Sequence, residues 1–146
     1  MPRSDFASHH SFRVRWSEVD PQGVVFNARY LDYADIAITE YWRAAGFRAA
    51  HPDQPFEFHV KKATVTWDAP IKPDEMIVVM ARTISTGRSS MTQLVEIHGE
   101  REDGGDDLRA VVDLVSVHVD LATHRPVPLP DFIAPLFAAF DAKATS

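Results

Sequence analysis

The sequence predicts an α+β domain in which one antiparallel β-sheet packs against a single long helix. Residues 28–45 carry one apolar face at helical spacing. Residues 56–120 contain four consecutive strand patterns separated by turn signals, and a fifth strand pattern precedes the helix at residues 11–17. The chain has 146 residues, the length of one ordinary domain, so we expect residues 1–146 to form a single unit.

The segment before the helix is typical of a strand followed by a tight turn. In "SFRVRWS" (residues 11–17), Phe, Val and Trp alternate with Arg, which predicts a half-buried strand. Asp20, Pro21 and Gly23 then fit the first, second and fourth positions of a type I turn. On local chemistry alone, Asp20 therefore has a purely structural explanation.

Residues 28–45 are predicted to form the long helix. Its apolar face consists of Leu31, Ala34, Ile38, Tyr41, Trp42 and Ala45. Asn27 is suited to be the N-cap, because its side chain can accept a hydrogen bond from a free N–H of the first turn. Gly46 is suited to end the helix in a left-handed turn, with Phe47 packing back on Trp42.

The strand that follows the helix is predicted to contain a bulge. "FEFHV" (residues 56–60) and "ATVTW" (residues 63–67) both alternate apolar and polar residues. Lys61 and Lys62 stand between them and shift the phase of the alternation. A phase shift of this kind predicts a β-bulge or a bend.

Three more strands and a short helix complete the predicted domain. "MIVVMARTI" (residues 76–84) is apolar on both faces. "MTQLVEIHGE" (residues 91–100) and "LRAVVDLVSVHVD" (residues 108–120) flank a polar loop, which predicts a hairpin. Apolar residues within 131–140 predict a short final helix.

Composition narrows the classes of function. The formal net charge is −6 and basic residues are not concentrated, which argues against a nucleic-acid partner. No apolar run is long enough to cross a bilayer and the N-terminus lacks the apolar stretch of a signal peptide, so we expect a cytoplasmic protein without a membrane partner. The absence of cysteine excludes a thiol nucleophile. The seven histidines show no metal-ligand spacing, so the sequence predicts no metal site.

The residues after the Asp20 turn suggest chemistry in addition to chain reversal. Val24, Val25 and Phe26 follow directly where a simple turn would lead into polar residues, and the helix begins at once. An acid would then lie near the positive end of a buried helix, where free N–H groups can polarise a carbonyl. A carboxylate at such a place can act as a base or as a nucleophile.

The stretch "VRWSEVDPQGVVFNARYLDYADIA" (residues 14–37) closely resembles the signature of the hotdog-fold acyl-CoA thioesterases of the 4-hydroxybenzoyl-CoA thioesterase/YbgC-like family. "GRSSMTQLVEI" (residues 87–97) also resembles the Arg/Ser-Ser strand opening of that family. The resemblance implies the hotdog fold, a curved antiparallel sheet wrapped around one long helix. It implies hydrolysis of an acyl-CoA to a free acid and coenzyme A, with coenzyme A as part of the substrate and no cofactor.

The resemblance also implies roles for individual residues. Asp20 would attack the thioester carbonyl or activate a water molecule, and the sequence leaves both routes open. The backbone N–H of Asn27 would polarise the thioester carbonyl, which makes Asp20 and Asn27 the predicted catalytic residues. Trp16 and Tyr30 would line the acyl pocket.

Further residues are predicted to contact the substrate. In this family the site usually forms between two subunits, so a homodimer or homotetramer is expected. Arg88, Ser89 and Ser90 would lie near the pantetheine and phosphates of coenzyme A, together with Lys62. His59 is a candidate because its strand is expected to run close to the helix start. The predicted substrate-binding residues are Trp16, Gly23, Val24, Tyr30, His59, Lys62, Arg88, Ser89 and Ser90.

Two other hypotheses remain open at this point. A non-catalytic hotdog module would bind acyl-CoA or a similar ligand and would need no acid at position 20. An unrelated small-ligand α+β fold, such as a cystatin-like cone, would usually place helices before a strongly curved sheet. The sequence does not specify the acyl group, nor whether coenzyme A or acyl carrier protein carries it.

Overall fold

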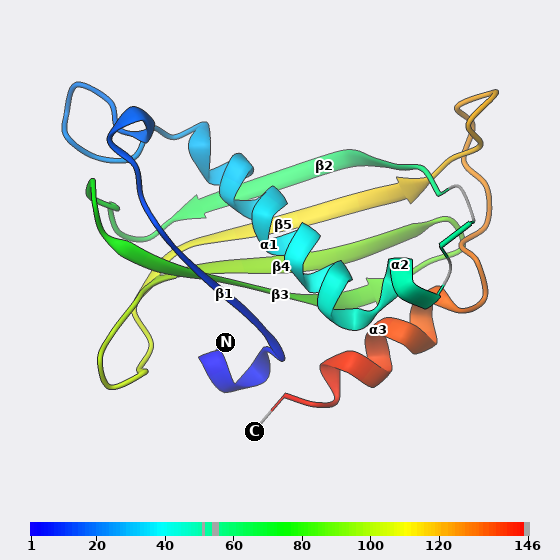
Figure 1. Ribbon diagram of the computed structural model, residues 1–146. Helices are drawn as coiled ribbons and strands as arrows, with labels where there is room; N and C mark the ends of the chain where they lie inside the picture. Colours follow the sequence, from blue (N-terminus) through cyan, green and yellow to red (C-terminus); the bar gives the residue numbers. More distant parts are fainter. Residues whose placement is uncertain (51, 54–55, 145–146) are drawn as a thin grey trace.

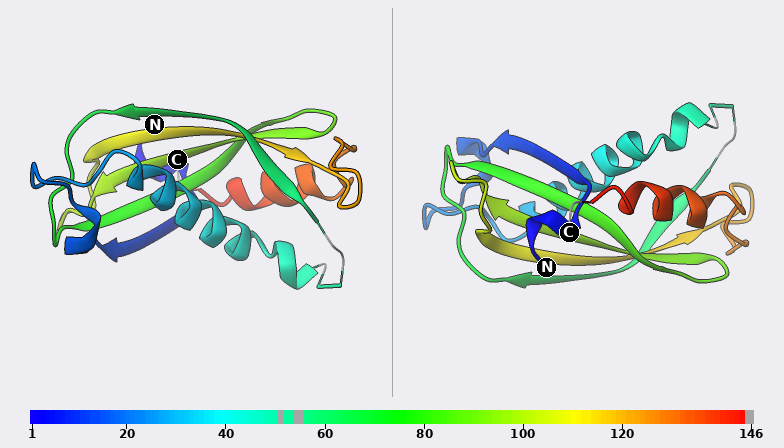
Figure 2. Two further views of the ribbon diagram at one scale, coloured as in Figure 1. Left: turned by 90° about the horizontal axis from the view of Figure 1, so that it is seen from above. Right: turned by 90° about the horizontal axis from the view of Figure 1, so that it is seen from below.

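The computed structural model describes residues 1–50, 52–53 and 56–144. Five antiparallel strands form one sheet in the order β1-β3-β4-β5-β2. The sheet curves around the long helix α1, which runs obliquely across the strands (Figures 1 and 2). The predicted curved antiparallel sheet with one long helix is therefore confirmed. The elements are η1 (Arg3–Asp5), β1 (Ser8–Arg13), η2 (Trp16–Glu18), α1 (Arg29–Ala45), α2 (Phe47–Ala50), β2 (Phe58–Trp67), β3 (Met76–Thr86), β4 (Ser90–Gly99), β5 (Leu108–His118) and α3 (Ile133–Asp141).

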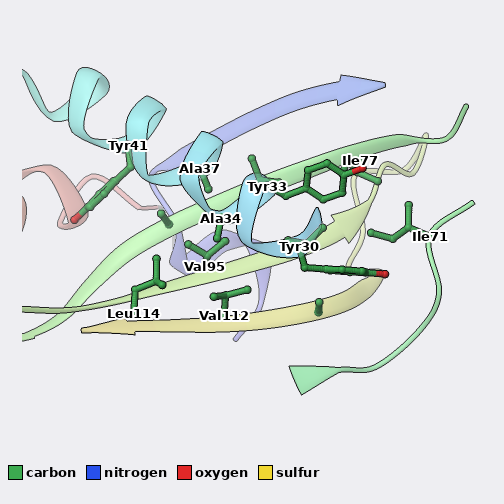
Figure 3. Packing of buried hydrophobic residues seen from close by; sticks show 14 of the residues in the cluster. Tyr30, Tyr33, Ala34, Ala37, Tyr41, Ile71, Ile77, Val95, Val112 and Leu114 are labelled. Atoms are coloured by element: carbon green, nitrogen blue, oxygen red, sulfur yellow. The ribbon is translucent and has the colours of Figure 1, made fainter. Parts of the chain in front are cut away.

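Helix α1 packs on the sheet through side chains that share one face. Its buried residues are Tyr30, Tyr33, Ala34, Ala37 and Tyr41. They meet sheet residues that include Ile77, Val95, Val112 and Leu114 (Figure 3). The small Ala34 and Ala37 let the helix backbone approach the sheet, while the tyrosines fill the space on either side. Full burial of one large apolar side chain contributes about 1.5–3 kcal/mol, so this face fixes α1 on the sheet.

The two ends of α1 differ in how well the sequence predicted them. Gly46 ends the helix in the left-handed conformation (φ 83°), and the ring of Phe47 lies 4.7 Å from that of Trp42, as predicted. The prediction of Asn27 as the N-cap is wrong. The helix begins at Arg29 after Ala28, without a side-chain cap. Asn27 instead belongs to the turn before the helix, in which Arg29 N–H donates to the Phe26 carbonyl (2.9 Å).

The first strand ends earlier than its alternation predicted. β1 stops at Arg13, and Trp16 lies in the 3₁₀ turn η2 with 71% of its surface exposed. The physical reason is local, because the Glu18 carboxylate accepts a hydrogen bond from Arg15 N–H (2.8 Å) and closes the chain into that turn. Val14 keeps its predicted burial, at 1% exposure.

The remaining strands follow the predictions. The register of β2 on β5 shifts between Val60 and Lys62, which is the predicted bulge. β4 and β5 form the predicted hairpin, and α3 is the predicted final helix. β3 is buried on both faces because Phe6 from the N-terminal segment covers Val78 and Met80 on the face opposite α1.

A buried carboxyl connects α3 to α1 and β3. The hydroxyl of Tyr41 donates to Asp141 Oδ2 (2.9 Å), and Thr83 N–H donates to the same oxygen (3.1 Å). Asp141 is only 9% exposed, and its Oδ1 has no hydrogen-bond partner among the described residues. Burial raises the pKa of Asp141, although the hydrogen bonds from Thr83 and Tyr41 and the charge of Arg82 oppose that rise.

We expect Asp141→Asn to stabilise the fold relative to the wild type as pH rises. Below the pKa of the unfolded chain, Asp141 is protonated in both states and carries no charge penalty. As pH rises through the higher pKa of the folded state, the buried carboxylate ionises and stability is lost. Asparagine stays neutral and can still accept from Tyr41 and Thr83. Urea unfolding at pH 4, 5.5 and 7 should show that the free energy of unfolding of Asp141→Asn exceeds that of the wild type by an amount that grows with pH. A constant difference between the two proteins would contradict this explanation.

Candidate functional site

Asp20 lies in the turn of a short hairpin between η2 and α1. Gly23 N–H donates to the Asp20 carbonyl (2.9 Å), and Gly23 has φ +80°, a conformation that glycine adopts without strain. Gln22 N–H donates to Asp20 Oδ1 (2.9 Å). The structural explanation of Asp20 as a turn residue is therefore confirmed. The second carboxylate oxygen, Oδ2, makes no hydrogen bond with the part of the chain that the structure describes.

The two arms of this hairpin carry the chain directly to the start of α1. Val19 and Val25 form an antiparallel bridge, and Phe26 N–H donates to the Glu18 carbonyl (3.0 Å). Val25 is buried and Asn27 is exposed. Within residues 1–50, 52–53 and 56–144, no hydrogen bond uses the backbone N–H of Asn27 or Ala28. These groups are free donors at the positive end of a 17-residue helix.

Aromatic side chains form a wall beside the helix start. Tyr30 is 2% exposed, and its ring lies 6.1 Å from the ring of Trp67 in an edge-on arrangement. Burial raises the pKa of Tyr30, partly offset by a hydrogen bond with the backbone of Ile71, its neighbour in Figure 3. Trp67 at the end of β2 is half-exposed. Sequence reasoning did not select Trp67, although it ends a strand pattern that alternates.

Trp16 does not lie with Tyr30 and Trp67 but on the side of α1 that faces β1. It lines a cavity of about 710 Å³ together with Phe12 of β1 and Ile36 of α1. Neither Asp20 nor Tyr30 lines that cavity. The structure therefore does not bring Trp16 and Tyr30 into one pocket within the chain, and the part of Trp16 in an acyl pocket stays a prediction.

Three of the predicted coenzyme A contacts, Arg88, Ser89 and Ser90, lie together with His59 at the end of the sheet away from Trp67. His59 and Ser90 flank the same residue of β5, Val117, from β2 and β4. Ser89 accepts a hydrogen bond through its carbonyl from His118 N–H (2.8 Å), and Arg88 accepts one from Leu129 N–H (2.8 Å). These four residues therefore lie together at one end of the strands, and the contact of Arg88, Ser89 and Ser90 with coenzyme A stays a prediction.

His59 and the Arg88–Ser90 turn do not lie near Asp20 of the same chain. β2 passes the start of α1 at Trp67, which contacts Tyr30, whereas His59 is near the other end of β2. Eight residues of strand separate them, or roughly 27 Å. The expectation that His59 lies close to the helix start is wrong for the single chain, and Lys62 is exposed between the two ends.

Neither a metal site nor a membrane-spanning helix is found in the part of the chain that the structure describes. In the described ranges, no group of three or more His, Cys, Asp or Glu side chains could hold a metal ion. None of the helices described is both long enough and apolar enough to span a bilayer.

Comparison with known proteins identifies a family and a curated relative. The family model described as the thioesterase-like superfamily matches residues 14–137. The acyl-CoA thioesterase YbgC of Haemophilus influenzae is 33% identical over 69 residues, which cover 46% of this chain and 51% of that protein. The match thus spans about half the length of this curated relative.

Two solved structures resemble the whole domain. A thioesterase from Thermus thermophilus, complexed with coenzyme A and Zn, is 27% identical with a TM-score of 0.76, covering 95% of this chain and 98% of that one. A mutant 4-hydroxybenzoyl CoA thioesterase complexed with 4-hydroxybenzoyl CoA is 16% identical with a TM-score of 0.78, covering 89% and 97%. The second likeness concerns the fold alone.

Proposed function

Because this chain belongs to the thioesterase-like superfamily, we propose that it hydrolyses an acyl-CoA to a free acid and coenzyme A. The observation that carries the proposal is the pairing of a reactive group with free donors on one hairpin. Asp20 Oδ2 has no hydrogen-bond partner in the described chain, and the N–H groups of Asn27 and Ala28 have none either. The YbgC relative is named an acyl-CoA thioesterase, and the Thermus thermophilus relative is complexed with coenzyme A.

The proposed chemistry assigns one role to each group. The thioester carbonyl oxygen accepts a hydrogen bond from Asn27 N–H, and the helix end stabilises the negative charge that develops on it. The Asp20 carboxylate either attacks the acyl carbon directly or removes a proton from the water that does so. In the first route the C–S bond breaks to leave an anhydride between the acyl group and Asp20, and water then hydrolyses that anhydride and restores the carboxylate. In the second route water adds to the acyl carbon and the C–S bond then breaks. In both routes the thiolate takes up a proton. Water supplies the new oxygen and the protons, so the products are the acid and free coenzyme A.

A second copy of the chain is part of the proposal. Among the described residues, β2 pairs with β5 alone and is an edge strand, and eight of its ten residues are exposed. Edge strands with unpaired backbone groups are templates for pairing with another strand. Exposed apolar side chains occur on this edge and at the start of α1, namely Val60 (61% exposed) and Trp67 (50%) of β2, Leu31 (44%) of α1 and Phe26 (51%) just before α1. Leu31 was predicted in the apolar face of the helix, and its exposure fits a face that another subunit covers.

Antiparallel pairing of two β2 strands would complete the site. It would lay the first residues of one β2 beside the last residues of the other. His59 and the Arg88–Ser90 turn of one copy would then approach Trp67 and Asp20 of the other, with Lys62 near the two-fold axis. The Arg88 guanidinium, the Lys62 ammonium and the hydroxyls of the two serines can donate hydrogen bonds to the phosphates of coenzyme A. Gly23 and Val24 would contribute through the backbone of the Asp20 turn.

The test is release of free thiol by the purified protein. We expect hydrolysis of at least one substrate in a panel of short aliphatic, long aliphatic and aromatic acyl-CoAs, and the preferred acyl group would identify the substrate class. Binding of acyl-CoA without any thiol release would contradict the proposed hydrolysis and favour a non-catalytic hotdog module.

A further inference from the structure

The loop between β2 and β3, residues 68–75, is bonded to both ends of the segment that carries Asp20. Where the chain leaves the sheet, Val14 N–H donates to the Glu75 carbonyl (2.8 Å) and Asp74 N–H donates to the Val14 carbonyl (3.0 Å). Where the chain returns toward α1, Val25 N–H donates to the Ile71 carbonyl (2.8 Å). The 68–75 loop therefore holds both ends of the segment from Val14 to Val25, which contains the Asp20 hairpin.

Arg109, near the start of β5, bonds to this loop through both its backbone and its side chain. Its carbonyl accepts from Asp68 N–H (2.8 Å) and Ala69 N–H (3.1 Å). Its Nη1 donates to the Pro70 carbonyl (2.9 Å) and to Glu75 Oε1 (3.1 Å), and its Nη2 donates to Glu75 Oε2 (2.8 Å). The planar guanidinium suits this bidentate contact, which a lysine ammonium does not reproduce.

The ion pair between Arg109 and Glu75 is expected to be charged on both sides at neutral pH. The Arg109 side chain is 14% exposed, so water screens the contact only partly. Burial alone would raise the pKa of Glu75, but the hydrogen bonds from Arg109 and from Lys72 N–H lower it below its ordinary value. Arg109 also bonds to both oxygens of Asp107 (3.2 and 2.8 Å), which holds the guanidinium from the other side.

Gly99 at the end of β4 leaves the space that the guanidinium occupies. A Cβ at this position would lie 2.4 Å from Asp107 Oδ2 and 2.5 Å from Arg109 Nη2. Both distances are far below van der Waals contact, so a side chain at position 99 would require the Asp107 carboxylate or the Arg109 guanidinium, or both, to shift from their present bonds. Gly99 is thus a second, independent part of the same arrangement.

We propose that Arg109 is a positioning residue for the reaction, which acts by fixing the 68–75 loop and through it the spacing between Asp20 and the Asn27 N–H. The proposal rests on the proposed function of the Asp20 hairpin. Arg109 does not touch the reacting atoms. Its loss is expected to lower turnover and to leave substrate affinity almost unchanged, because a small displacement affects the transition state most.

The kinetic test compares Arg109→Gln with a matched control, Arg3→Gln. The Arg3 side chain is 13% exposed and bonds to one backbone carbonyl, of Gly105, and one carboxylate, of Glu100, and it makes no hydrogen bond or ion pair with residues 68–75 of the described chain. We expect kcat of Arg109→Gln to fall by up to about 100-fold with little change in KM. Arg3→Gln should keep the kcat of the wild type. An unchanged kcat in Arg109→Gln, or an equal fall in both variants, would overturn the proposal.

A second measurement separates this proposal from the proposed function. Amide hydrogen exchange at Val25 reports its bond to Ile71 whether or not the protein hydrolyses thioesters. We expect faster exchange at Val25 in Arg109→Gln, with the amide of Thr83 at the far end of β3 unaffected. Gly99→Ala should give the same pattern and serves as the second variant if Arg109→Gln does not fold. Unchanged exchange at Val25 in the folded variants would overturn the positioning role, whereas an inactive wild type with the expected exchange would overturn only the thioesterase assignment.

Discussion

The Asp20→Asn protein is expected to remain folded and to hydrolyse its best acyl-CoA about 10²–10⁴-fold more slowly than the wild type. The substitution removes the negative charge of Oδ2 but keeps an oxygen that can accept from Gln22 N–H. The backbone hydrogen bond from Gly23 to the carbonyl of residue 20 is also kept. The turn therefore survives while the base or nucleophile is lost.

Asp103→Asn is a matched control for this experiment. Asp103 Oδ1 also accepts from the N–H two residues ahead, that of Gly105 (2.8 Å), in an exposed loop of the β4–β5 hairpin. Steady-state thiol release should fall only in Asp20→Asn. Urea unfolding of Asp20→Asn should agree with that of the wild type within about 0.5 kcal/mol. A large loss of stability in Asp20→Asn would mean that the turn, not the chemistry, requires the acid.

Val60→Asp is expected to convert the protein from a dimer to a monomer and to abolish most of its activity. Val60 is 61% exposed on the edge strand β2, where we propose that a second copy pairs. An uncompensated charge buried at that interface costs about 3–5 kcal/mol. This is enough to weaken the dimer by at least about 100-fold. Activity falls with it, since each site would take His59 and the Arg88–Ser90 turn from the other copy.

Ile84→Asp provides the comparison for this variant. Ile84 is 47% exposed on β3, which lies between β1 and β4 and away from the free edge of β2. Sedimentation velocity over a range of concentrations, with thiol release on the same samples, measures both properties. A monomeric wild type that is fully active would contradict the shared site.

The course of the chain was predictable wherever local patterns agree with the final packing. The bulge before Lys62 and the left-handed Gly46 both depend on a few neighbouring residues, and the structure contains both. The start of α1 was not predictable from Asn27, because the chain makes a further turn through Ala28 before the helix begins. β1 ended early because Glu18 closes a turn that strand alternation does not reveal.

The candidate site was predictable only in its local part. Asp20 and its turn are encoded within four residues, so the sequence identifies them directly. Arg109 and Trp67 lie near the site only because the strands pair in this register, and both are tens of residues away from Asp20 in the sequence. No local pattern therefore indicates them. The separation of His59 from Asp20 has the same origin, since it depends on which end of β2 reaches the helix.

Single-turnover hydrolysis, with enzyme in excess over a bound acyl-CoA, tests the role of Asp20 most directly. This measurement follows cleavage of the bound thioester itself, so slow product release does not affect it. We expect the wild type to convert its bound substrate completely, and Asp20→Asn to bind the same substrate but leave nearly all of it uncleaved over the time that the wild type needs. Cleavage by Asp20→Asn at the wild-type rate would contradict the account, as would a wild type that holds its acyl-CoA without cleaving it.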